Sequence, residues 1–211
     1  MGTVMVDVVL DIIEQGGPVF IAIILAGIWV WFLLIDRSYV LRKNKAPLYA
    51  EEKEIISEVI SGSPEKLQSK LSRYRGIYSG LMLMLQENRL LGNSTLKRKT
   101  DEYIIKNWSR MEEGFSTIRV LTAAIPLLGL LGTVTGMVRT FRVITMFGSG
   151  NPVLLAGGIS EALLTTQSGL VLAFPAIIFL VTVSNRKVRL KSVMEHSASQ
   201  VLNNLREKEN G

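Results

Sequence analysis

The sequence predicts an all-α, polytopic membrane protein with three long transmembrane helices that extend into a cytoplasmic helical region. Of the 211 residues, 48% are hydrophobic, and they gather in long blocks instead of alternating with polar stretches. Three blocks, residues 15–35, 120–138 and 162–185, contain no charged residue. Each can cross a hydrocarbon core of about 30 Å as a helix that rises about 1.5 Å per residue. Signals for β-strands are sparse, so helices are expected throughout.

The chain divides into seven predicted segments. In order, they are an amphipathic helix on the outer (periplasmic) face at 1–17, a first span at 18–36, a cytoplasmic helical region at 37–118, a second span at 119–145, a periplasmic turn at 146–152, a third span at 153–185, and a cytoplasmic C-terminal helix at 186–211.

The segment before the first span has apolar residues at helical spacing, with acidic residues between them, as in a helix that lies on a membrane surface. Gly16-Gly17-Pro18 then interrupts the chain, and proline suits the first turn of the spanning helix. Neither Lys nor Arg precedes residue 37, whereas a cleavable signal sequence needs a basic start. Basic residues follow the block instead, so the first span is expected to be retained as an anchor.

The distribution of positive charge predicts the orientation. Of the 24 Lys and Arg residues, none lies before residue 37, sixteen lie in 37–119, two are Arg139 and Arg142, and six follow residue 185. The positive-inside rule then places the N-terminus outside and the middle region and the tail in the cytoplasm. This topology accounts for the net charge of +6. A nucleic-acid partner is not expected, because the basic residues are interleaved with acidic ones and form no recognisable binding motif.

The cytoplasmic region carries clear helix boundaries. Ser63-Pro64-Glu65 is a good helix start, with a capping hydroxyl, a proline at the first helical position and an early acid. Gly62, Gly76 and Gly92-Asn93 divide the region into about four pieces. We expect two or three short helices and one long helix that runs into the second span.

The second span presents one face of small residues. On a helix, Gly129, Gly132, Thr133, Gly136 and Thr140 fall within about 100° of one another. Small residues let membrane helices approach closely, which favours a packing face. Alternatively, the hydroxyl of Thr133 lines a narrow polar path. In the same span, a proline shapes the helix; it is Pro126.

The third span contains Glu161, the only ionisable residue between Val153 and Ser184. A charge at depth costs about 2.5–3.5 kcal/mol, and such residues usually mark ion pathways. Burial favours the neutral acid, so Glu161 is predicted to exchange protons; the alternative is a neutral acid hydrogen-bonded between helices. The span is longer than one crossing, which leaves the depth of Glu161 open. Thr165 and Ser168 share its helical face.

Further small residues predict close helix packing in the third span, and a second proline shapes it. They are Gly157, Gly158 and Gly169, with Pro175 as the proline.

Other kinds of chemistry find no support in the sequence. Without cysteine there is neither a disulfide nor a thiolate metal site, and the lone His196 in the tail reads as a solvated residue. No metal and no cofactor are expected. An intramembrane enzyme would need at least two cooperating polar groups at depth, and there is one acid, so the protein is not expected to be an enzyme. Gly148-Ser149-Gly150 is a turn, too short for a nucleotide motif.

Two motifs resemble the signature of the MotA/TolQ/ExbB proton-channel family. The first runs from Ala124 to Thr140 and contains PLLGLLGTV; the second is GISEAL at 158–163, followed by Thr166, Gly169-Leu170 and Ala173-Phe174-Pro175. The resemblance covers about 70 residues strictly, and the three-span topology extends it over the chain. Three spans instead of four fit the MotA branch poorly, and the short link before the third span favours the ExbB branch over the TolQ branch.

The resemblance implies a homopentamer of long helices in the bacterial inner membrane, around a pore that holds the single spans of an ExbD-like partner. That partner's transmembrane aspartate would carry the proton, and the complex would energise TonB-dependent outer-membrane transport of the iron–siderophore type through a TonB-like protein. Thr133 and Thr166 would line the pore, with Glu161 near them. The helical wheel pairs Glu161 with Thr165 instead, and Thr166 points away from it. A TolQ-like motor for envelope maintenance and a non-conducting scaffold are the alternatives.

Overall fold

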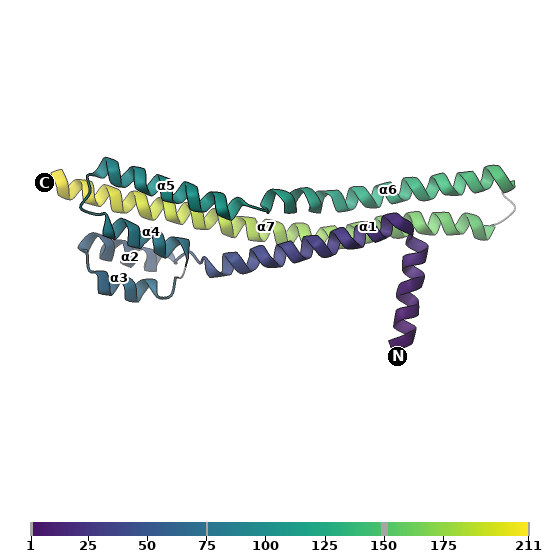
Figure 1. Ribbon diagram of the computed structural model, residues 1–211, viewed down its shortest axis with the longest axis horizontal. Helices are drawn as coiled ribbons and strands as arrows, with labels where there is room; N and C mark the ends of the chain where they lie inside the picture. The colour runs from purple at the N-terminus through teal and green to yellow at the C-terminus, as the bar shows by residue number, and fades with distance from the viewer. Residues whose placement is uncertain (1, 75, 149–151, 211) are drawn as a thin grey trace. The chain divides into compact units, whose positions relative to one another are not determined.

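The computed structural model describes residues 2–74, 76–148 and 152–210, which form seven α-helices and contain no strand (Figure 1). The helices are α1 (Gly2–Lys43), α2 (Tyr49–Ser61), α3 (Pro64–Leu71), α4 (Ile77–Glu87), α5 (Asn93–Glu112), α6 (Phe115–Phe147) and α7 (Pro152–Asn210). Three stretches are long and apolar enough to cross a membrane, namely Gln15–Lys43, Asn93–Phe147 and Leu155–Lys208. The all-α class and the three long apolar helices are therefore confirmed.

The chain folds as two compact units. The first, called the apolar unit here, comprises Met1–Ile35 and Gly114–Val181. The second, the polar unit, comprises Asp36–Glu113 and Thr182–Gly211. The apolar unit holds the first part of α1, α6 and the first part of α7, and the polar unit holds the remaining helical segments.

A sharp kink divides α1 at Gly17, whose φ of 65° and ψ of −172° are not helical. Figure 1 shows the N-terminal part of α1 turning away at this point. The positive φ favours glycine, and Pro18 directly after it starts the longer helical arm. The apolar stripe predicted before the kink involves side chains that lie outside the described residues, so it stays a prediction.

One helix boundary differs from the sequence-based expectation. The long helix predicted to run into the second span is interrupted, because α5 ends at Glu112 and Gly114 adopts a left-handed conformation (φ 79°) before α6 begins. The third span and the C-terminal helix form one continuous helix, α7, as expected for a span that extends into a further helical region; neither glycine nor proline occurs between Pro175 and Asn210. The predicted turn at 146–152 lies partly outside the described residues, at 149–151.

The other predicted boundaries in the polar unit are confirmed. Ser63 is the N-cap of α3 and Pro64 its first residue, although the Ser63 hydroxyl forms no capping hydrogen bond; Gly62 ends α2 in a left-handed conformation. Gly76 and Gly92 are the residues before α4 and α5.

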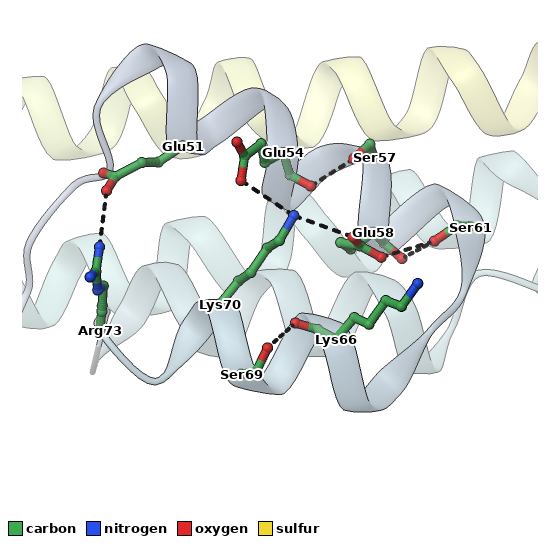
Figure 2. A network of polar contacts seen from close by, with 9 residues as sticks. All are labelled: Glu51, Glu54, Ser57, Glu58, Ser61, Lys66, Ser69, Lys70 and Arg73. Atoms are coloured by element: carbon green, nitrogen blue, oxygen red, sulfur yellow. Dashed lines mark hydrogen bonds and ion pairs between the residues drawn. The ribbon is translucent and has the colours of Figure 1, made fainter.

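Ion pairs join α2 to α3 on the surface of the polar unit (Figure 2). Lys70 Nζ lies 3.3 Å from a carboxylate oxygen of Glu54 and 3.2 Å from one of Glu58, and Arg73 lies 3.7 Å from Glu51. Exposed pairs of this kind contribute about 0–1 kcal/mol each, so they orient α3 more than they stabilise it.

A buried polar cluster connects α2, α4 and α7 inside the polar unit. The carboxylate of Glu52 is 5% exposed and accepts a hydrogen bond of 2.6 Å from the hydroxyl of Ser197. His196 Nδ1 lies 2.9 Å from the same carboxylate oxygen, and the Tyr78 hydroxyl lies 3.2 Å from Ser197 Oγ. Burial raises the pKa of Tyr78 to about 12. His196, expected to be a solvated tail residue, is therefore half-exposed and bound to a buried acid.

A buried cation joins α5 to α7 in the same unit. The side chain of Lys187 is 2% exposed, forms an ion pair with Glu112, and places its ammonium 5.0 Å from the ring centre of Trp108. Lys191 lies 4.9 Å from the same ring. The ion pair and the aromatic ring beside the ammonium offset the cost of burying the charge of Lys187, whereas an isolated buried lysine would be destabilising.

We predict that Glu52→Ala lowers the free energy of unfolding by about 1–3 kcal/mol, because the buried hydroxyl of Ser197 loses its acceptor. The measurement is the thermal melting midpoint of the purified full-length protein in detergent. Glu54→Ala is the matched control, since that side chain is exposed and its ion pair with Lys70 contributes little. Equal melting midpoints for the two variants would contradict a structural role of the buried cluster.

Candidate functional site

Helices α6 and α7 approach each other through their backbones. A Cβ built on Gly129 would lie 3.1 Å from the carbonyl oxygen of Thr165, and one on Gly136 would lie 2.9 Å from the carbonyl oxygen of Gly158. A Cβ on Gly169 would likewise reach backbone atoms of α6. Because backbone cannot move aside as a flexible side chain can, the small-residue face of the second span is a tight packing face.

The same contacts fix the direction of the three long segments of the apolar unit. Along α6, positions near 125, 129, 132, 136 and 140 meet positions near 169, 165, 162 and 158 of α7, so these helices are antiparallel. On α1, Gly27 lies against Leu172 and the Trp31 ring lies 6.0 Å from that of Phe179, so α1 is parallel to α7. This alternation is the one that three consecutive spans require.

Hydroxyl groups of the hairpin are bonded to backbone carbonyls. Thr166 donates across the interface to the carbonyl oxygen of Gly129 at 3.0 Å. Thr165, 1% exposed, donates within α7 to the carbonyl oxygens of Glu161 and Ala162. Both residues therefore contribute to the α6–α7 contact, although the helical wheel places them on different faces.

The hydroxyl of Thr133 lies at the edge of the packing face. Thr133 is partly exposed and donates to the carbonyl oxygen of Leu130, one turn earlier, at 2.6 Å. Its position leaves one side of the residue open to lipid, to a neighbouring chain or to a pore. Ser168 on α7 is half-buried.

Glu161 is held by an ion pair that the sequence did not predict. Its residue is 8% exposed, and Oε2 accepts a hydrogen bond from Nη1 of Arg139 on α6 at 2.5 Å. The Arg139 side chain is 60% exposed, so the guanidinium retains access to its surroundings. A charge-assisted hydrogen bond of this kind satisfies a buried carboxylate.

The other carboxylate oxygen of Glu161 faces the kink in α1. A Cβ built on Gly17 would collide with Oε1, and the φ of 65° at this position already favours glycine. Glycine at position 17 therefore serves two purposes, since it permits the kink and leaves room for the carboxylate. Three segments of the apolar unit meet at Glu161: the α1 kink, α6 and α7.

The contact with Gly17 also locates Glu161 along the apolar segment. From Gly17 to Asp36, the first charged residue after the kink, α1 rises about 28 Å, close to a hydrocarbon core of about 30 Å. On α6, the distance from Arg119 to Arg139 is about 30 Å by the same rise. Glu161 therefore lies level with the start of the longer arm of α1, while α6 continues beyond Arg139 to Phe147 and α7 begins at Pro152, before Glu161.

Arg139 could have been found from the sequence by considering the hairpin. Residues 139 and 161 are equally distant from residue 150 in the link, so an antiparallel hairpin brings them to the same level. The uncharged block of the second span ends at residue 138, and hydropathy alone does not indicate that Arg139 is a partner for Glu161.

The remaining predicted residues fall in varied places. Gly132, Gly136, Gly158 and Gly169 are buried in the α6–α7 contact. Gly157 departs from the packing prediction within this chain, because it is exposed and a Cβ there would meet nothing within 4 Å. Pro126 and Pro175 lie inside α6 and α7. Among residues 2–74, 76–148 and 152–210, no three His, Asp or Glu side chains gather where they could hold a metal ion.

Comparison with known proteins identifies the family of the chain. The sequence pattern that defines the MotA/TolQ/ExbB proton channel family matches residues 65–196. A putative ExbB-like biopolymer transport protein of Synechocystis is 30% identical over 184 residues, which cover 83% of this chain and 70% of that protein. The biopolymer transport protein ExbB of Pseudomonas putida is 27% identical over 87% of this chain and 58% of its own length, and that of Salmonella typhimurium is 26% identical over 87% and 79%.

Three helices long enough to cross a membrane, a hairpin packed through small residues and a buried acid define a multi-pass membrane protein of the kind that this family describes. The chain belongs to the MotA/TolQ/ExbB proton channel family. Within that family it resembles the ExbB proteins, and it is a multi-pass membrane protein of the proton-channel energiser type.

We predict that Gly136→Ala lowers the free energy of unfolding by about 1–3 kcal/mol, because the new methyl group meets the backbone of α7 within 3 Å. Gly157→Ala is the matched control, and its exposed helical position should make it neutral or slightly stabilising. Thermal melting of both purified proteins in detergent measures the difference. If Gly136→Ala melts like the control, the close approach of α6 and α7 is refuted.

Proposed function

We propose that the protein is the proton-channel subunit of a bacterial inner-membrane motor that uses the proton motive force to energise TonB-dependent transport across the outer membrane. In this proposal it forms a homopentamer around the single spans of an ExbD-like partner whose transmembrane aspartate carries the proton, and it acts on a TonB-like protein. Its N-terminus is periplasmic and its C-terminus cytoplasmic. The transported cargo is of the iron–siderophore type.

The observation that carries the proposal is the carboxylate of Glu161, buried in a helix contact that contains the hydroxyls of Thr165 and Thr166. Ionisable residues in membrane segments usually mark ion pathways, because they are costly to keep there otherwise. Membership of a proton-channel family and the names of the relatives, which are biopolymer transport proteins, support the same reading.

The surface of the apolar unit supports an assembly in lipid. Large apolar side chains along α6 are exposed in the single chain, including Leu127, Leu130, Val134, Val138 and Phe141. So much exposed apolar surface requires a cover, which lipid tails and neighbouring copies of the chain would supply. Thr133 lies among these residues, so in a pentamer its hydroxyl could reach a central pore while the glycine face stays packed on α7.

The free energy released by each proton is large enough to drive the proposed motor. A unit charge that crosses 100 mV releases about 2.3 kcal/mol, and one pH unit adds about 1.4 kcal/mol. Each proton could then bias a conformational or rotary step by several kcal/mol, which exceeds thermal energy and is sufficient to drive mechanical work.

Replacing Glu161 tests the proposal in cells. In a deletion strain, the wild-type chain should restore uptake of an iron–siderophore, whereas Glu161→Ala should reduce uptake at least tenfold at matched membrane levels and with the assembly intact. The control is Glu195→Ala, because Glu195 lies on the same helix in the polar unit with an exposed side chain.

Three outcomes separate the hypotheses. Uptake with wild type and the control but not with Glu161→Ala supports the proposed motor. Full uptake with Glu161→Ala removes Glu161 from the proton path. Failure of the wild type to restore uptake overturns the TonB assignment, and restored detergent resistance in the same strain would then indicate a TolQ-like role.

A second test concerns the pore-lining role of Thr133. Thr133→Val keeps the shape of the side chain and removes the hydroxyl, so we expect a several-fold loss of uptake with an unchanged melting midpoint. Thr135→Val is the matched control, since Thr135 is also exposed on α6 and bonded to its own helix. A drop in melting midpoint without selective loss of uptake would instead favour the non-conducting scaffold.

A further inference from the structure

We propose that Arg139 is a positioning residue that holds Glu161 as a carboxylate and must release it before Glu161 takes up a proton. This inference rests on the proposed function, since it assigns a partner to the acid in the proton path. In this proposal Glu161 is an ionised carboxylate paired with a cation that can move away, and not a neutral buried acid.

The geometry separates the two carboxylate oxygens of Glu161. Oε2 is bound by Nη1 of Arg139 at 2.5 Å, and Oε1 faces the backbone of Gly17 at the α1 kink. The carboxylate is therefore fixed on both sides by different helices. A proton that binds at Oε2 has to displace the guanidinium, so the ion pair and the acid protonated at Oε2 are mutually exclusive states.

Among the described residues, one charged side chain contacts the carboxylate of Glu161. On α6, Arg139 is the cation that contacts it; on α1, the group in contact is uncharged Gly17; and on α7, Thr165 donates to the main-chain carbonyl of Glu161 and not to its carboxylate. Among the described side chains, the protonation of Glu161 is thus governed chiefly by the position of one guanidinium.

The difference in exposure makes Arg139 the movable partner. The Glu161 side chain is 10% exposed, whereas that of Arg139 is 60% exposed. Arginine has a long side chain, a permanent charge and a planar group that binds carboxylates well, and it can swing outward while remaining charged. Loss of the ion pair leaves a buried carboxylate without a cation, which favours uptake of a proton.

The resulting cycle is balanced in protons and charge. In the closed state, Arg139 is cationic and Glu161 anionic. When the guanidinium moves away, one proton binds to the carboxylate; when that proton leaves, the ion pair re-forms. Arg139 keeps its own proton throughout; the proton that forms the O–H bond of Glu161 comes from a hydronium ion, which becomes water, and it returns to water when that bond breaks.

The test measures the protonation of Glu161 directly. N,N′-dicyclohexylcarbodiimide attaches to protonated carboxyl groups in apolar surroundings, and mass spectrometry of the peptide that contains Glu161 quantifies the product. Membrane vesicles with the full-length chain are treated at pH 7 for wild type, Arg139→Gln, Arg139→Lys and Arg142→Gln. Arg142 is the matched control, because it lies one turn further along α6, is exposed, and has no ion pair with Glu161 among the described contacts.

We expect Arg139→Gln to be labelled at Glu161 at least about tenfold faster than wild type, since an opposite charge at this distance changes the proton equilibrium of a carboxyl group by that factor or more. Arg139→Lys keeps a cation and should restore slow labelling, and Arg142→Gln should match wild type. Equal labelling of wild type and Arg139→Gln would overturn the inference.

The wild-type chain provides a second test that does not depend on any variant being stably folded. Slow labelling at pH 7 that accelerates as the pH falls supports an ionised, paired Glu161; fast labelling at pH 7 overturns it. Uptake is measured in parallel. If the wild type energises no uptake, the proposed function fails, and the labelling result still decides the state of Glu161.

Discussion

The close approach of α6 and α7 is the constraint on which the rest of the apolar unit depends. In lipid, helices gain little from burying apolar surface against one another, so their association relies on van der Waals contact and on hydrogen bonds between helices. Gly129, Gly136 and Gly169 let the two backbones come within contact distance, and the Thr166 hydroxyl then reaches the Gly129 carbonyl at 3.0 Å. A larger residue at any of these glycines would separate the helices and lengthen that bond. The close approach of α6 and α7, on which the site depends, therefore requires glycine at these positions.

The register of this contact also determines the electrostatics. A shift of one residue along a helix rotates a side chain by about 100°, which would remove Glu161 from Arg139 and expose one charge without its partner. The glycine contacts on one side and the ion pair on the other thus specify the same register. Gly17 adds a third condition, because a Cβ at the α1 kink would occupy the space of the carboxylate. The acid is fixed by packing, by charge and by backbone conformation together.

Hydropathy predicted the class of fold because the cost of exposing polar backbone in lipid leaves few structures available to long apolar segments. The break at Gly114 escaped this prediction, since it depends on a single glycine and not on hydropathy. The site was predicted in part. Glu161 stands out in an apolar run, whereas the Arg139 pair depends on hairpin register, and the buried Glu52–Ser197 contact joins residues 145 positions apart. Pairings of that kind have no local signal in one sequence.

The two units satisfy their buried charges in different ways, and the difference bears on mechanism. In the polar unit, the carboxylate of Glu52 accepts a hydrogen bond from the hydroxyl of Ser197, which is itself fully buried. In the apolar unit, Glu161 has a partner that is more than half exposed. A buried charge with an enclosed partner stabilises one structure, because separating the pair would require the core to open. A buried charge with an exposed partner can be separated by the motion of one side chain, and this is the property that a group must have if it is to bind and release protons repeatedly.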